Sequence, residues 1–156
     1  MIRTITTTVL CAILTMPSFA ADVTYRNDVK PMLKAQCESC HGDKSPTLAD
    51  FDLDKERYAK AMQGPRISTY ETLLQLVGWP DTGALMRRLD DGANTADRKP
   101  GNMYMHLGAT DAERAANLKI LKAWVGEGAW HLNRWKAKGD VPGITKEQLE
   151  KIKVEY

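Results

Sequence analysis

Cysteine is scarce in this 156-residue sequence, which contains only Cys11, Cys37 and Cys40. No second cysteine pair follows Cys37 and Cys40, and His106 and His131 stand too far apart to act as a histidine pair. A four-ligand zinc site is therefore not expected. No strand–helix–strand pattern surrounds the pair, which argues against a thioredoxin-type redox motif.

The sequence also lacks an excess of either charge. It has 22 Lys and Arg residues against 20 Asp and Glu residues, a formal net charge of +2. Nucleic-acid binding depends on a basic face. We therefore expect no nucleic-acid partner.

No apolar run is long enough for a membrane-spanning helix, which needs about 20 residues. The most apolar stretch, residues 9–14, follows the basic Arg3 and is broken by Pro17. Ala20 is one of the small residues that a signal peptidase reads. We predict that residues 1–20 are a signal peptide cleaved after Ala20, that the protein is periplasmic, and that the remaining chain has no integral membrane span.

The sequence has no alternating strand pattern and no internal repeat, so the predicted fold is all-α. Periodicity and capping residues predict helices over 28–40, 54–63, 69–77, 82–89, 110–127 and 145–154, and loops over 42–53 and 91–109. Asn27 or Asp28 is expected to cap the first helix, and Asp81 the fourth. Gly128 is expected to end the fifth helix.

The chemistry is carried by Cys37-Glu38-Ser39-Cys40-His41, which has the C-x-x-C-H spacing of haem attachment. Two thiols three residues apart at a helix end reach the two vinyl groups on one porphyrin edge. The adjacent imidazole then faces the iron from the same side. We predict one covalently bound haem c, with Cys37 and Cys40 as its thioethers and His41 as the proximal iron ligand.

The long loop over 91–109 is expected to supply the ligand opposite His41, because loops of this length in small domains are usually functional. A methionine there stabilises ferrous iron and favours electron transfer. Met103 is the first candidate, since Gly101 and Asn102 before it suit a backbone that approaches the haem. The alternatives are Met105, His106, Met86 or an open site.

The segments 26–33 and 37–42 resemble the opening of class I cytochrome c domains, and the segment 103–128 resembles the methionine loop and final helix of that family. The resemblance implies a helical domain over 21–128, built around one covalent haem. Residues 129–156 would then be a C-terminal helical extension packed on the domain. In this family the first and last helices cross. This crossing would bring together Val29, Leu33, Leu118, Leu121 and Trp124.

The family also implies residues around the haem. A proline carbonyl usually orients the proximal histidine, and Pro46 is the nearest candidate. Haem propionates need donors when they are buried. The candidates are Arg66, Tyr70, Trp79 and Arg87. The simpler interpretation places Trp79 in the core and Arg87 on a solvated helix face. Trp130 and Trp135 are expected to pack the extension onto the domain.

Taken together, these features predict an electron carrier and not an enzyme, with other redox proteins as donor and acceptor. The iron would change between Fe(III) and Fe(II) with both axial ligands retained. One alternative is a haem enzyme or ligand sensor with an open or displaceable sixth site. Another is a cytochrome subunit of a larger oxidoreductase.

Overall fold

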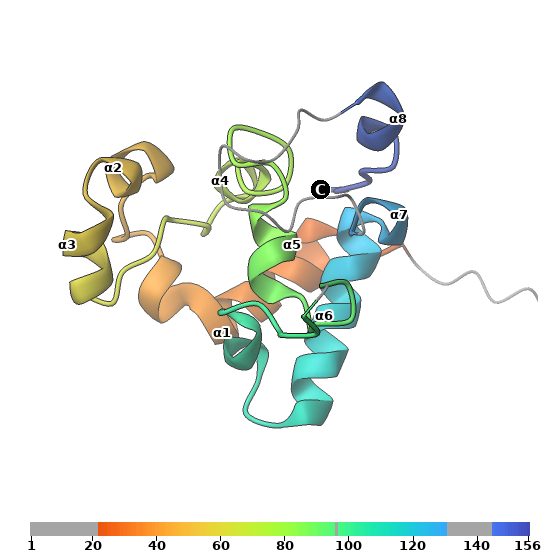
Figure 1. Cartoon of the computed structure of the whole chain (residues 1–156), viewed down its shortest axis with the longest axis horizontal. Helices are drawn as coiled ribbons and strands as arrows, with labels where there is room; N and C mark the ends of the chain where they lie inside the picture. The colour runs from red at the N-terminus through yellow and green to blue at the C-terminus, as the bar shows by residue number, and fades with distance from the viewer. Residues whose placement is uncertain (1–21, 96, 131–144) are drawn as a thin grey trace, which may run out of the picture.

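The computed structural model describes residues 22–95, 97–130 and 145–156, and these residues form helices and turns without a β-strand (Figure 1). The predicted signal peptide and Trp135 lie outside the described residues. The elements are η1 (Tyr25–Val29), α1 (Lys30–His41), α2 (Leu48–Leu53), α3 (Lys55–Lys60), α4 (Tyr70–Leu74), α5 (Ala84–Leu89), η2 (Tyr104–Leu107), α6 (Asp111–Val125), α7 (Glu127–Trp130) and α8 (Lys146–Leu149). The all-α prediction is confirmed.

The first helix begins earlier than the sequence pattern predicts. Thr24 is the cap: its hydroxyl accepts the Asn27 amide at 3.2 Å, and the Asp28 carboxylate accepts the Thr24 amide at 2.9 Å. The reciprocal pair fixes one turn of π-helix, η1, ahead of α1. Asn27 and Asp28 therefore lie inside the helix, and the prediction that one of them caps it was wrong.

Two further helices also begin where the sequence pattern does not predict a start. α2 occupies part of the predicted 42–53 loop, because the Thr47 hydroxyl caps it by accepting the Asp50 amide at 3.1 Å. Asp81 does not cap α5. The helix begins after Gly83, whose backbone lies in the left-handed region at φ 76°. The Asp81 carboxylate instead accepts a 2.7 Å hydrogen bond from the Arg87 guanidinium. The Arg87 side chain is only 12% exposed, so its placement on a solvated face was wrong.

The capping box at Thr110 and Glu113 starts α6 as predicted. α6 ends at Val125, and Gly126, not Gly128, terminates it with φ 96°. A Cβ on Gly126 would lie 2.5 Å from the Lys151 carbonyl oxygen, so a side chain is excluded there by both conformation and space. The chain then turns directly into α7. α8 also begins at its predicted capping box, on Thr145, but ends at Leu149, before the predicted boundary.

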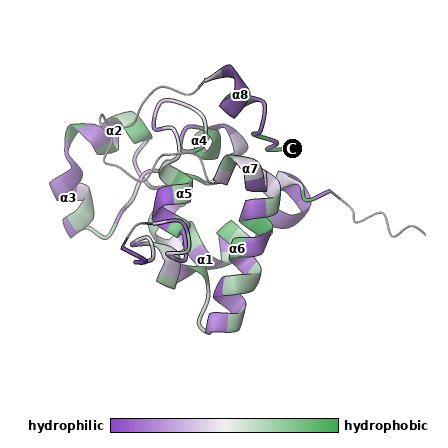
Figure 2. Ribbon diagram, turned by 45° about the vertical axis from the view of Figure 1, so that its right-hand side comes forward, coloured by the Kyte–Doolittle hydropathy of each residue, from purple (hydrophilic) through white to green (hydrophobic). Residues whose placement is uncertain are grey.

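The first and last core helices pack together, as the family resemblance implies. The buried core includes Val29, Leu33, Leu118, Leu121 and Trp124. η1 lies against α6, where the Tyr25 and Trp124 rings are 6.2 Å apart. Hydrophobic residues recur between hydrophilic ones along α6 (Figure 2). At helical spacing they form one apolar side, which packs into this core.

The last six residues, 151–156, pack across this helix crossing, and we call them the C-terminal strap. Its Glu155 carbonyl accepts hydrogen bonds from the Tyr25 amide and the Trp124 indole, both at 2.8 Å. The Tyr156 ring stacks on Tyr25 at 5.8 Å and lies under the Arg26 guanidinium. The described part of the predicted extension is therefore bound to the helical core. Among the described residues, no helix is long and apolar enough to cross a membrane.

Candidate functional site

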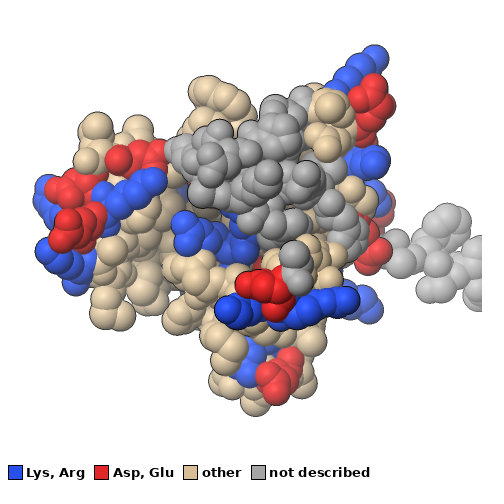
Figure 3. All heavy atoms as spheres, viewed as in Figure 1, with Lys and Arg blue, Asp and Glu red and all other residues tan. Residues whose placement is uncertain are grey.

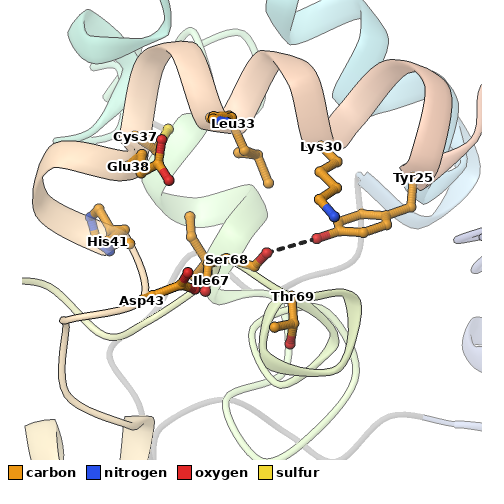
Figure 4. Close-up of a pocket in the computed structure, with 12 residues that line it drawn as sticks. Tyr25, Lys30, Leu33, Cys37, Glu38, His41, Asp43, Ile67, Ser68 and Thr69 are labelled. Atoms are coloured by element: carbon orange, nitrogen blue, oxygen red, sulfur yellow. Dashed lines mark hydrogen bonds between the residues drawn. The ribbon is translucent and has the colours of Figure 1, made fainter.

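The last turn of α1 brings the predicted haem-attachment residues together. Cys37 and Cys40 are half-buried and form no disulfide, so both sulfur atoms are available for attachment. Cys37 and His41 line a pocket of about 330 Å³ between α1 and the segment 67–69 (Figure 4). Leu33 and Ile67 supply apolar walls, so the attachment residues lie against apolar side chains.

The orientation of His41 is fixed by a proline carbonyl, as the resemblance implies, but the proline is Pro65. The His41 Nδ1 lies 2.7 Å from the Pro65 oxygen. Because a carbonyl only accepts, Nδ1 carries the proton and Nε2 presents its lone pair. The Pro46 carbonyl instead accepts the Arg66 amide at 2.8 Å. Pro46 was therefore the wrong candidate.

Gly64 is the second residue on which this orientation depends. A Cβ built on Gly64 would lie only 2.0 Å from the His41 Cε1 atom. The segment is also fixed from both sides, since the Gly64 amide donates to the Cys40 carbonyl at 2.9 Å and the Ile67 amide to the His41 carbonyl at 3.0 Å. The backbone therefore lies directly against the imidazole, and only glycine leaves room for the ring.

The environment of the Cys37 thiol is unlike that of a reactive redox thiol. Burial and, to a smaller extent, the neighbouring Cys40 together raise the pKa of the Cys37 thiol to about 11. A thiol with so high a pKa is protonated at neutral pH and is a weak nucleophile. The described residues also contain no group of three or more His, Cys, Asp and Glu side chains that would hold a metal ion by themselves. The raised pKa agrees with the argument against a thioredoxin-type site.

The loop that carries Met103 is attached to the end of α5. The Gly101 amide donates to the Asp90 carbonyl at 2.8 Å, and the Met103 amide donates to the Arg88 carbonyl at 2.9 Å. A Cβ on Gly101 would lie 2.3 Å from the carbonyl oxygens of Arg87 and Arg88. The close approach that this glycine permits is therefore to α5. The sequence-based expectation assigned it to the haem.

The candidate distal ligands differ in exposure. Met103 is partly buried and packs against the core, whereas Met105 is 58% exposed and His106 is exposed on η2. Met86 is 1% exposed inside α5. η2, which follows Met103 directly, lies against α1 and α5. Met103 is thus the one of these four side chains that is neither sealed within a helix of the core nor turned to solvent.

Of the four propionate candidates, three have other surroundings. Tyr70 donates its hydroxyl to the Val154 carbonyl at 2.7 Å, and Arg87 is paired with Asp81. Trp79 is 80% exposed, so its placement in the core was wrong. Arg66 keeps a buried Nε without a partner. Two residues further along the chain, the buried hydroxyl of Ser68, which lines the pocket, also lacks a partner.

Sequence reasoning missed Gly64, Pro65 and Ser68. The Gly64-Pro65 dipeptide directly follows the predicted helix 54–63 and was interpreted only as its end, whereas α3 ends at Lys60, before both residues. Its contact with a histidine more than 20 residues earlier leaves no periodic signal in the sequence. A serine hydroxyl in a loop likewise carries no spacing that would distinguish it from a solvated one.

An all-helical fold, two unpaired thiols beside an oriented imidazole, and a methionine loop attached to the core define the class of mono-haem c-type cytochromes. The family model described as PccH cytochrome c matches residues 24–156. The chain belongs to this family, and as a member it is a haem electron-transfer protein that binds one haem c covalently. The matched range includes all of the residues predicted as the extension and all but the first three residues of the predicted domain.

A solved structure agrees with this assignment. The chain is similar to the monohaem cytochrome PccH from Geobacter sulfurreducens, with 50% sequence identity and a TM-score of 0.74. The match covers 86% of this chain and 99% of the other. A comparison with curated proteins found no match.

Proposed function

We propose that this protein is a periplasmic electron carrier whose haem is attached through Cys37 and Cys40, with His41 and Met103 as axial iron ligands. The observation that carries the proposal is the His41 imidazole, whose Nδ1 is bound to the Pro65 carbonyl at 2.7 Å. This contact fixes the ring and leaves Nε2 for the iron. When bound, the haem supplies a one-electron change between Fe(III) and Fe(II).

The choice of Met103 is supported by its surroundings. Its amide is bound to α5, and its side chain is partly buried next to the segment that packs on α1. A ligand that stays in place in both redox states needs this kind of support, because movement between the states slows electron transfer. Met105, 58% exposed, lacks it.

Arg66 and Ser68 are our candidates for haem propionate binding. Each has a buried polar atom without a partner, and Ser68 lines the same pocket as Cys37 and His41. The buried Nε–H of a half-buried guanidinium and a buried hydroxyl are donors that a carboxylate requires in such a place. Arg114 also has a buried unpaired Nε, but its guanidinium is bound to Asp111 and to the Gly108 carbonyl.

The partners we propose are redox proteins that dock transiently. Basic and acidic side chains are interspersed on the face shown in Figure 3, and the net charge of the chain is only +2. Long-range attraction to a strongly charged partner is therefore not expected. Association is expected to depend only weakly on salt.

Covalent attachment is tested by the mass of the denatured protein. We expect acid–acetone extraction to leave the colour with the polypeptide, and the mass to exceed that of the processed chain by one haem. Replacing both thiols, Cys37→Ser with Cys40→Ser, should abolish this mass increase. A colourless extracted polypeptide of unmodified mass would refute the proposal.

The distal ligand is tested by Met103→Ala. We expect complete loss of the methionine–iron charge-transfer band of the ferric protein and a lower reduction potential, because a methionine ligand raises it. Met105→Ala is the matched control and should leave both unchanged, since this side chain is exposed. Retention of the band in Met103→Ala, with its loss in Met105→Ala or Met86→Ala, would move the assignment to that residue.

A further inference from the structure

We propose that Asp90 and Trp130 are positioning residues for the distal side of the haem. Together they hold the loop 90–103 in the conformation that presents Met103. The inference rests on the proposed role of Met103 as the distal ligand. It links α7, next to the C-terminal segment of the chain, to the iron site through buried contacts.

The Asp90 carboxylate is fully buried and accepts four hydrogen bonds. Its Oδ2 accepts the amides of Gly92 at 2.9 Å and Asn94 at 3.2 Å. Its Oδ1 accepts the Asn94 side-chain amide at 2.8 Å and the Trp130 indole at 2.9 Å. Burial alone would raise the pKa of Asp90, but these hydrogen bonds outweigh it and lower the pKa below its ordinary value. The site therefore stabilises the ionised form of the Asp90 carboxylate.

The backbone of the same residue is bound to the segment that carries the ligand. The Asp90 carbonyl accepts the Gly101 amide at 2.8 Å, two residues before Met103. The Met103 amide is bound in turn to the Arg88 carbonyl at 2.9 Å. Since Gly101 lies in direct contact with the end of α5, this part of the loop cannot shift without breaking these bonds. Both ends of the loop therefore meet at Asp90.

Trp130 connects Asp90 to the C-terminal part of the fold. It belongs to α7, is fully buried, and donates to Asp90 across 40 residues of sequence. The Lys122 ammonium lies 5.8 Å from its ring centre, and the same ammonium approaches the Asp91 carboxylate at 3.9 Å. The indole thus connects the start of the loop with α6 and α7, which are themselves part of the core.

These contacts raise the free energy that is required to open the loop 90–103. An external ligand can bind the iron only after Met103 has left it, and the apparent affinity for that ligand is reduced by the small fraction of molecules in the open state. When Asp90 keeps its partners, opening must break some of their bonds. When a substitution removes the charge of Asp90, the N–H donors of Gly92, Asn94 and Trp130 are poorly paired even while the loop is closed. A weakened Asp90 site therefore increases the open fraction.

The test is a titration of the ferric holoprotein with imidazole at pH 7, followed by the methionine–iron band. We expect Asp90→Asn to bind imidazole about tenfold more tightly than the unaltered protein. Trp130→Phe removes one donor and keeps an aromatic ring, so a smaller shift, about threefold, is expected in the same direction. Asp97→Asn is the matched control, because this carboxylate belongs to the same loop but is exposed. It should not change the affinity.

The outcomes separate the inference from the proposed function. If Asp90→Asn and Trp130→Phe bind imidazole no more tightly than Asp97→Asn, the positioning role is refuted even though Met103 remains the ligand. If Met103→Ala leaves the band and the imidazole affinity unchanged, the proposed ligand itself is wrong. Should Asp90→Asn fail to accumulate as folded protein, Trp130→Phe alone decides the question. A merely structural role would lower the melting temperature without changing the imidazole affinity at 25 °C.

Discussion

Replacing Gly64 by alanine is expected to reduce the yield of haem-loaded protein at least about tenfold. The added methyl group would lie 2.0 Å from the His41 Cε1 atom. Either the ring or the segment 64–67 must move. The ring is held by the Pro65 carbonyl, and the segment by the hydrogen bonds of the Gly64 and Ile67 amides to the Cys40 and His41 carbonyls. Moving the ring breaks its contact with the Pro65 carbonyl and turns Nε2 away from the iron. The measurement is the ratio of haem absorbance to polypeptide in protein purified after export.

Gly78→Ala is the control for this substitution. A Cβ on Gly78 would meet nothing closer than the Leu74 carbonyl oxygen at 3.9 Å, which is an ordinary contact. We expect its haem content to equal that of the unaltered protein. If Gly64→Ala also retained full haem content and an unchanged proximal histidine signature, the close approach of the 64–67 backbone to His41 would have no role in ligation.

Deleting residues 152–156, most of the C-terminal strap, is expected to destabilise the protein by at least about 3 kcal/mol. The buried Trp124 indole and the Tyr25 amide would lose the Glu155 carbonyl, and the Tyr70 hydroxyl would lose the Val154 carbonyl. Each buried group without a partner costs about 1–3 kcal/mol. The melting temperature should fall by roughly 10 °C. Haem attachment should persist, because the thioether residues belong to α1.

Leu149→Ala is the control for the deletion. This side chain on α8 is 55% exposed, so its truncation should change the free energy of unfolding by less than about 0.5 kcal/mol. Trp124→Phe removes one of the lost hydrogen bonds together with part of a buried ring and should cost at least about 1 kcal/mol. A deletion variant as stable as Leu149→Ala would mean that the strap contributes nothing to the helix crossing.

Some features of this protein were predictable because their causes are local in the chain. The C-x-x-C-H spacing places two thiols and an imidazole on one helix end, and that arrangement needs no distant residue. The capping boxes at Thr110 and Thr145 work across three residues, and both were located correctly. The all-α fold followed from periodicity, which is also a short-range property.

Other features were decided by contacts between distant segments. Pro65, and not Pro46, orients His41 because the chain comes back to the imidazole only after α2 and α3. Distance along the sequence does not show where this happens. Trp79 is exposed at 80% although its large aromatic side chain suits a core. Asp81 meets Arg87 and therefore does not cap α5.

The sequence by itself thus determined the chemistry: a helical protein with a site for one covalent haem at the end of its first helix. The tertiary structure decided how that site is supported. It selected Pro65 and Gly64 to orient His41, separated the partly buried Met103 from the exposed Met105, and joined Asp90 to Trp130. The reason is physical: attachment chemistry depends on neighbours along the chain, whereas orientation and burial depend on which distant segments pack together.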